Sequence, residues 1–346
     1  MHVPQTVPIC VIGENSDCLL PNRASCPLIL RMWSSRITRP LVLAQLGILL
    51  LLLVIWASPA EAQPSPGTQG KPPGPFFSLS GTVVEQFDSD FDTQGSYSVS
   101  SLLLRASVAQ PVSRKTILGL SLSYDLLDYD FSDDVVLESA SPWERVHGLN
   151  LALPIIRRIN EKWTMVLSPS IGSYGASGAA FSDTLTYGAI FAATYAFKPD
   201  RKLGFGVAAF ERIGQSRGFP FVSIDWRLTE RLRLTNPLTV GPTGPAGLEL
   251  AYEISPKWEF GAGGAYRNIR FRLDERDLEP NGIGEQRGIV TFARILHAIN
   301  PKLNLVIYTG LVLDGELRIE DEDAQRRRTV GHGTAPLLAI SLSGRF

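Results

Sequence analysis

The sequence predicts an all-β protein, an antiparallel transmembrane β-barrel of about 14 strands after an N-terminal signal helix, with about 12 strands as the alternative. Three observations predict this class. Apolar residues alternate with small or polar ones through residues 77–346, the connections alternate between short and long, and an apolar segment precedes the pattern. Alternation alone also fits a soluble β-sandwich. Short turns on one side and long loops on the other are typical of outer-membrane barrels, so they favour the barrel.

The segment before the strands predicts export. Arginines precede the apolar run Leu41–Trp56, and the small-residue exit Ala60–Ala62 follows it. This order is typical of a secretory signal peptide, here residues 32–62 with cleavage after Ala62. A membrane anchor is the alternative, but the run is shorter than the ~20 residues that a spanning helix needs.

Two further segments complete the predicted organisation. Residues 1–31 precede Met32, fit an upstream extension from a misplaced start, and hold all three cysteines. Residues 63–76 are rich in proline and glycine and predict a flexible linker to the barrel at 77–346. The barrel would therefore contain neither a disulfide nor a reactive thiol. The net charge of −1 argues against a nucleic-acid partner.

Fourteen stretches carry the alternation. The expected strands are 77–87, 96–109, 115–131, 146–157, 163–174, 185–197, 202–213, 219–228, 231–236, 247–254, 258–272, 286–297, 303–318 and 334–346. Most reach the roughly 9–11 residues of a tilted membrane strand, while 231–236 and 247–254 are the weak members. An even number of strands places both termini on the short-turn, periplasmic side.

The two parities of these strands predict two surfaces. The apolar parity would face lipid, and the parity with glycine, serine, threonine and scattered charge would line the lumen. The lumen-facing polar candidates are Asp225, Arg227, Glu249, Glu253, Glu259 and Arg294. Inside a barrel such charges pair with one another or meet water, and the glutamates would weakly favour cations.

The last strand alternates up to the final residue of the sequence. Leu338, Ile340 and Leu342 share the lipid-facing parity, and Phe346 ends the chain. This strand is expected to pair with the first, at 77–87, because a membrane barrel leaves no free edge.

Three stretches resemble a known family: GPAGLELAYEIS, RNIRFRLDE…NGIGE and APLLAISLSGRF. They are similar to a bacterial family described only as a domain of unknown function, number 6268, over roughly 76–346. The resemblance implies a barrel-like fold and supplies no catalytic residues. The final strand also resembles the carboxyl-terminal signal of bacterial outer-membrane proteins. That resemblance implies that the barrel-assembly machinery recognises Leu338, Ile340, Leu342 and Phe346.

No motif predicts an enzyme, so we expect no catalytic residue, cofactor or metal. A barrel lipase would need a Ser–His pair oriented by a third polar group. His147 and His332 lie near the long-loop rim, without spacing that links them to a serine. The serines that match by type are Ser139, Ser141 and Ser182. The aspartates of DSDFD, at 88–92, lack the glycine and distal glutamate of a calcium loop, so a solvated loop is expected there.

Two loops leave alternatives open. In EDEDAQRRR (320–328), Arg326, Arg327 and Arg328 would either contact lipopolysaccharide phosphates or pair with the acidic half. NPLTVGPTGPAG (236–247) would either fold into the lumen as a constriction or form a simple rigid loop, and we favour the rigid loop.

The leading functional hypothesis is passive passage of small solutes across a bacterial outer membrane. A barrel of this size has room for more than its own side chains, and its surroundings would be outer-membrane lipid with lipopolysaccharide. A structural or adhesive barrel with a plugged lumen is the first alternative. An outer-membrane lipid-modifying enzyme is the second.

Overall fold

The computed structural model describes residues 74–132, 142–213, 215–239, 241–243, 246–277 and 279–346. The predicted extension, the signal peptide with its cleavage after Ala62, and nearly all of the predicted linker lie outside these residues. Within the described part of the chain, no helix combines the length and the apolar character needed to span a membrane.

Sixteen strand segments and a short 3-10 helix make up the described chain. They are β1 (Phe76–Asp90), β2 (Ser96–Pro111), β3 (Thr116–Phe131), β4 (Arg145–Ala152), β5 (Ile155–Arg158), β6 (Trp163–Ala176), η1 (Phe181–Thr184), β7 (Leu185–Lys198), β8 (Arg201–Arg212), β9 (Gln215–Arg227), β10 (Leu232–Thr235), β11 (Gly247–Ser255), β12 (Trp258–Arg272), β13 (Ile283–Asn300), β14 (Leu303–Glu320), β15 (Arg326–His332) and β16 (Ala335–Arg345).

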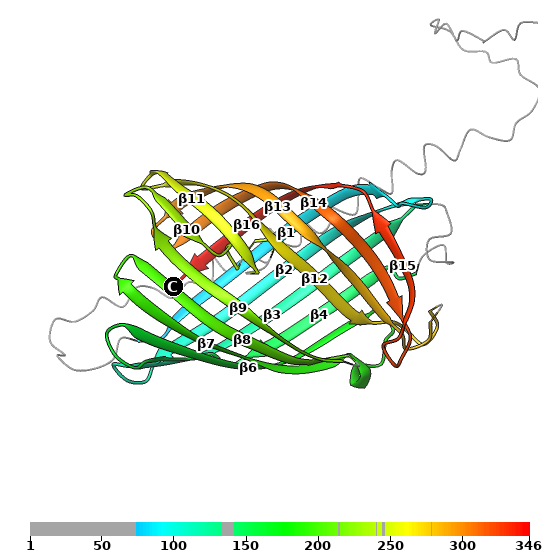
Figure 1. Cartoon of the computed structure of the whole chain (residues 1–346), viewed down its shortest axis with the longest axis horizontal. Coiled ribbons are helices and arrows are strands. Elements are labelled where there is room, and N and C mark those ends of the chain that lie inside the picture. Colours follow the sequence, from blue (N-terminus) through cyan, green and yellow to red (C-terminus); the bar gives the residue numbers. More distant parts are fainter. Residues whose placement is uncertain (1–73, 133–141, 214, 240, 244–245, 278) are drawn as a thin grey trace, which may run out of the picture. The chain divides into compact units, whose positions relative to one another are not determined.

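The segments form a closed antiparallel barrel of fourteen strands, which confirms the predicted fold class and its larger strand number. β4 and β5 both lie between β3 and β6, and β15 and β16 both lie against β14, so each pair counts as one strand. Closure comes from β1 and β16, with Val83 opposite Ile340. Figure 1 shows the tilted strands, with β16 beside β1. Closure gives most backbone amides of the wall partners without water, as lipid requires.

The break between β4 and β5 has a local cause. Pro154 has no backbone N–H, so it cannot continue the ladder of hydrogen bonds. Its carbonyl still accepts a hydrogen bond from the N–H of Gly119, at 2.8 Å. A Cβ on Gly119 would lie 2.7 Å from the ring of Pro154, so the glycine makes room for the proline.

The outer surface follows the predicted parity. On β16, Leu338 and Ile340 are 42 % and 51 % exposed, whereas Leu337 and Ala339 are buried inside. Large apolar side chains are exposed in the same way on the other strands, and Phe346 is 38 % exposed at the short-turn end. An apolar outer band of this kind is typical of barrels that span a membrane.

Two predicted loops are shorter than expected. Residues 326–332 were expected in a loop, but they form β15, which extends the β14 hairpin beyond β16. The charges of RRRTVGH mask an alternation in which Val330 and His332 point inward and are buried. At the other end of the chain, β1 continues to Asp90, so part of the DSDFD stretch is strand as well.

Two buried apolar clusters fill part of the interior. The distal cluster lies where strands meet the long loops, and it consists of Phe91, Tyr97, Val99, Leu127, Tyr129, Trp143, Val146, Ala176, Phe271, Leu273, Leu317, Ile319 and Val330. The central cluster lies against β13, β14 and β16, and it consists of Val84, Val290, Phe292, Val306, Tyr308, Val312, Ala335, Leu337 and Ala339.

Candidate functional site: the barrel interior

A buried ion triad lies on the inner wall near the short turns. Arg294 Nε donates to Glu249 Oε1 at 2.8 Å, and its Nη2 donates to Glu259 Oε1 at 2.6 Å. The side chains of Arg294 and Glu249 are 1 % and 0 % exposed, whereas Glu259 keeps 29 % of its surface. The arrangement follows from the register, because Arg294 on β13 lies opposite Gly261 on β12 and crosses it to reach β11.

Gly261 is required for this crossing. A Cβ at this position would lie 2.5 Å from Glu249 Oε1 and 2.9 Å from Arg294 Nε. A larger residue would therefore separate the two charges or push Arg294 off the wall. The triad fixes three neighbouring strands to one another and fills their side of the lumen with paired charge.

The other predicted lumen residues do not join the triad. Asp225 accepts from Arg233 Nε at 2.7 Å and lies 3.5 Å from the Lys202 ammonium. Arg227 donates to the carbonyl of Glu230 at the neighbouring turn, at 2.8 Å. Glu253 is exposed. The structure thus brings together three of the six predicted residues and places the rest near the short-turn rim.

The sequence interpretation missed several inward arginines, Arg105 and Arg233 among them. Arg105 of β2 forms an ion pair with Asp125 of β3, and both lie on the inward parity of their strands. The inward parity of RLRLT on β10 also contains Arg233. Applying the alternation rule to arginines as well as glutamates would have found both.

Aromatic side chains of the distal cluster pack together at the long-loop end of the lumen. Trp143 packs edge-on against Tyr129 and Phe271, with ring centroids 5.8 Å and 5.2 Å apart. Phe91 stacks on Tyr97 with centroids 5.2 Å apart. These rings come from strands on different sides of the barrel, so they narrow the lumen at this end.

A polar network adjoins the distal cluster and ends at His332. Arg267 donates to Gln86 Oε1 at 2.5 Å, and Gln86 Nε2 donates to the Tyr97 hydroxyl at 3.0 Å. That hydroxyl lies 2.7 Å from His332 Nε2, and His332 Nδ1 lies 3.0 Å from Ser89 Oγ. Since Ser89 donates to the carbonyl of Gly333, its oxygen is left to accept from His332 Nδ1–H. The network therefore favours a neutral imidazole with its proton on Nδ1.

The loop between β10 and β11 enters the lumen, so the preference for a simple rigid loop was wrong. Pro237 and residues 241–243 are buried, and Leu238 packs against the central cluster. A Cβ on Gly241 would lie 2.8 Å from the hydroxyl of Tyr308 on β14. The glycine and prolines suited to an exposed turn also let a chain pack closely against a wall, and the sequence pattern did not distinguish these two uses.

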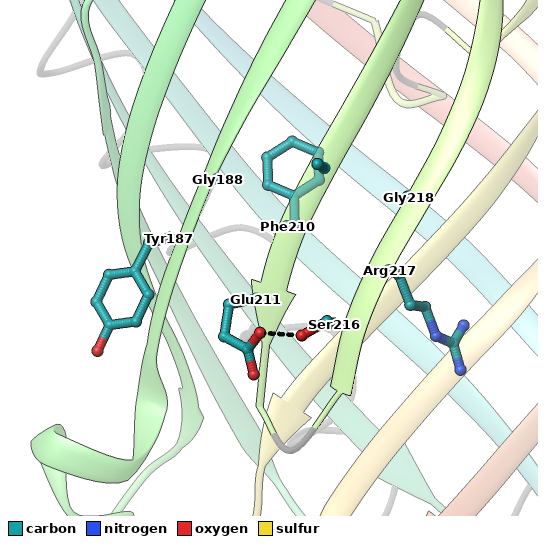
Figure 2. A pocket seen from close by; sticks show the side chains of 8 residues that line it. Tyr187, Gly188, Phe210, Glu211, Ser216, Arg217 and Gly218 are labelled. Atoms are coloured by element: carbon teal, nitrogen blue, oxygen red, sulfur yellow. Dashed lines mark hydrogen bonds between the residues drawn. The ribbon is translucent and has the colours of Figure 1, made fainter.

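The wall formed by β6 to β9 remains open on its inner side. Its inward residues Ser168, Ser170, Thr194 and Ser223 are only partly buried. Phe219 also points inward, opposite Ala208 on β8, yet it is 46 % exposed. At the long-loop end of this wall, a hollow of about 410 Å³ is lined by Tyr187, Glu211 and Ser216 of the outward parity and by Phe210 and Arg217 of the inward parity (Figure 2). The partly buried serines and threonine show that the inner face of this wall is less filled than that of β11 to β14.

One Ser–His contact lies on the outer rim. His147 Nε2 is 3.1 Å from Ser177 Oγ, and Nδ1 is 2.9 Å from the Tyr124 hydroxyl. Of the serines considered from the sequence, Ser182 bonds to Asp183, and Ser139 and Ser141 lie outside the described residues. The third group is a phenol where a hydrolase triad uses a carboxylate or amide, so the contact fits a rim hydrogen bond better than a nucleophile.

The charged loops contain no metal cluster in the described part of the chain. Of the three arginines proposed to contact lipopolysaccharide, Arg327 pairs with Asp321 at 2.6 Å. Arg326 is exposed on the same short strand, β15.

Solved structures similar to this chain include several channels. The COG4313 outer membrane channel from Pseudomonas putida F1 is 12 % identical, with 83 % of this chain and 100 % of that chain covered and a TM-score of 0.44. The Pseudomonas putida toluene transporter TodX is 11 % identical, with 79 % and 90 % covered and a TM-score of 0.37. The KdgM porin in complex with disordered oligogalacturonate is 8 % identical, with 78 % and 99 % covered and a TM-score of 0.33. Likenesses this weak carry no argument about function.

Sequence comparison gives the family. No curated protein matches the chain. A family model matches residues 91–326, which is more than half of the chain, and its description is "Domain of unknown function". This match agrees with the resemblance of the strand stretches noted above. The chain therefore belongs to the family Domain of unknown function (DUF6268).

Proposed function

We propose that this protein is a bacterial outer-membrane channel that passes small solutes passively. The single observation that carries the proposal is the asymmetry of the lumen. Small polar side chains on the inner face of β6 to β9 keep part of their surface, whereas β11 to β14 are filled by the triad and the central cluster. A structural barrel with a plugged lumen would gain from filling both walls, because empty space costs packing energy.

The outer-membrane location is part of the same proposal. Large apolar side chains form the exposed surface, and the predicted signal peptide at 32–62 and terminal strand ending in Phe346 would supply export and assembly. The outward side chains would contact lipid. Exposed Arg326 on β15 would be available to lipopolysaccharide phosphates, as a proposed partner contact.

The channel and the plugged barrel predict different results in a transport assay. The distal cluster and the 236–246 loop both obstruct the axis, so the wild-type channel is expected to conduct ions poorly compared with an open porin. Purified protein in liposomes should nevertheless swell them when small solutes are offered in a graded series. A barrel that shows the heat-dependent gel mobility of a folded β-barrel, yet passes none of these solutes, would contradict the channel.

A further inference from the structure

The barrel wall is not paired along its whole height. β9 pairs with β8 from Gln215 to Trp226, but on its other edge it pairs with β10 only through residues 225–227. Among the described residues, no strand pairs with the remaining edge of β9, residues 215–224.

The facing edge belongs to β12 and is also unpaired. β11 reaches only as far as Gly247, opposite Ala265. Beyond it, Tyr266 N–H donates to the carbonyl of Ala246 at 3.0 Å, and Arg272 is bridged to Gly175 of β6. Between these two points, no strand of the described chain pairs with β12 on this side. The wall is therefore split between β9 and β12 over its long-loop half.

Asn236 holds the point where the split begins. Its Oδ1 accepts from Ile224 N–H at 2.9 Å, and its Nδ2 donates to the carbonyls of Val222 and Gly247, at 3.2 and 2.9 Å. A single amide thus supplies the partners that the strand edges of β9 and β11 lose as they separate. Because these backbone groups are hydrogen-bonded, the strands separate at a defined residue and do not fray there.

The open edge of β9 is adapted to remain without a strand partner. Ile224 N–H and Val222 C=O face the split, so the backbone groups of even-numbered residues point there. Pro220 falls on this parity, and it has no N–H to leave unsatisfied. Proline on an edge also disfavours the addition of a strand from a second protein.

The split lies at the depth of the apolar outer band. Val207, which pairs with Pro220, is 54 % exposed on the outer face, and Val222 is 47 % exposed. On the far side of the split, Tyr266 is 48 % exposed. Irregular backbone at membrane depth is tolerated where it lines a cavity, so the lumen behind the split should reach the lipid here.

Aromatic side chains line the inner side of the split. Phe219 points inward from β9 and is half exposed, and it stacks on Phe210 of β8 with centroids 6.3 Å apart. The distal cluster packs into the long-loop end of the lumen. A molecule in the outer leaflet would thus meet an apolar entrance in the wall, while a molecule in the aqueous medium would meet the packed distal cluster.

We propose that the split between β9 and β12, bounded by Asn236 and the Gly175–Arg272 bridge, is a lateral port through which small apolar compounds pass between the outer leaflet and the lumen. This inference rests on the proposed channel function and names its substrate class. Such compounds dissolve in lipid and bind aromatic faces without losing strong hydration. Polar solutes would have to leave water to use the same route.

The experiment compares an apolar probe with a polar one in cells that produce the full chain in their outer membrane. The apolar probe is N-phenyl-1-naphthylamine, whose fluorescence reports its entry, and the polar probe is a radiolabelled disaccharide. Phe219→Asp places a charge on the inner side of the port. Phe87→Asp is the matched control, because Phe87 is as exposed as Phe219, at 46 %, but lies near the end of β1, away from the split.

Wild-type protein should raise entry of the apolar probe. Phe219→Asp should return it to the level of cells without the protein, and Phe87→Asp should leave it raised. Equal apolar entry in wild type and Phe219→Asp, at equal amounts of folded barrel, would overturn the port while leaving the channel intact. Entry of the disaccharide alone in wild type would also overturn the port. Entry of neither probe would mean that the proposed function itself fails.

A second measurement does not depend on transport. Phe219→Cys carrying a bimane label should be quenched by lipids with a nitroxide high on the acyl chain, since the port opens to the outer leaflet. The same label on Ser170→Cys should be quenched much less. Equal quenching at both sites would overturn the port, and so would a purified dimer in which β9 of one copy pairs with another chain.

Discussion

Arg272 of β12 is the bridge partner of Gly175 of β6, although β7 to β11 lie between these strands in the barrel order. Arg272 Nε also donates to the carbonyl of Asp183 in η1, at 3.1 Å, and Nη1 donates to the carbonyl of Asn281, at 2.6 Å. The two sides of the barrel therefore meet at the long-loop end. The intervening strands are excluded from this contact, and the wall splits beside it.

Gly175→Val should weaken this meeting point. A Cβ on Gly175 would lie 2.4 Å from Thr184 Cγ2, so a larger side chain must push η1 away from β6. The expected cost is about 1–3 kcal/mol of unfolding free energy, as for other overpacked sites. Urea unfolding in detergent micelles, followed by gel mobility, would measure it. Gly264→Ala is the control, because a Cβ there meets nothing closer than 3.6 Å; an equal loss for both substitutions would contradict the account.

Arg294→Ala should be strongly destabilising. It leaves Glu249 buried without its partner, and removal of one member of a buried ion pair typically costs about 3–5 kcal/mol. The paired change Arg294→Met with Glu249→Leu should recover much of that loss, since it removes both charges together. Arg227→Ala is the control at an exposed turn, where a change within about 0.5 kcal/mol is expected. The unfolding free energies of the variants would be measured in the same micelles. A double variant no more stable than Arg294→Ala would contradict the pairing of Arg294 with Glu249.

Shortening the loop between β10 and β11 should open the lumen. Replacing residues 238–243 by two glycines removes the contacts of Leu238 with the central cluster and of Gly241 with Tyr308. Ion conductance in planar bilayers should rise above that of the wild-type protein. Asn236 is retained in this variant, so the split keeps its bounding residue. Unchanged conductance in a correctly folded variant would show that the loop does not obstruct the pore.

The distal network should lose stability on acidification. Burial lowers the pKa of His332 below its ordinary value; the hydrogen bond to the Gly333 carbonyl opposes this, the positive charge of Arg267 adds to it, and Asp92 opposes it slightly. The unfolded chain then binds the proton more readily, so stability is complete above a pH of about 6.5 and falls below it until the folded pKa is reached. Amide hydrogen exchange in β1 and β15, corrected for the intrinsic effect of pH, should quicken between about pH 7.5 and 5.5. His332→Gln should abolish this dependence, and equal corrected rates in the wild-type protein would contradict it.

Most of the wall could be predicted from the sequence, because its chemistry is local. Lipid on one face and lumen on the other impose a period of two, and Leu338 and Ile340 obey it as well as residues on any other strand. Closure of β16 on β1 followed from the same rule, since membrane barrels leave few free edges. The strand boundaries failed mainly where polar hairpins rise beyond the membrane, as at Arg326–His332.

The interior was harder to predict, because it depends on which strands lie opposite one another. Glu249 and Arg294 were both recognised as inward residues, but their pairing across Gly261 needs the register of three strands. The inward course of the 236–246 loop and the split beside Pro220 have no periodic signature. Pro220 within a strand was nevertheless a local indication of an open edge.

The most direct test of the central claim is whether solutes move along the inner face of β6. The native sequence has no cysteine after residue 26, so Ser170→Cys introduces the sole thiol of the barrel. Leu167→Cys is its counterpart on the lipid-facing parity of the same strand, where Leu167 is 44 % exposed. Flux into liposomes would be measured before and after complete reaction with a charged, water-soluble thiol reagent. A channel along this wall predicts that the reagent blocks flux through Ser170→Cys and spares Leu167→Cys. Undiminished flux through fully labelled Ser170→Cys would contradict it.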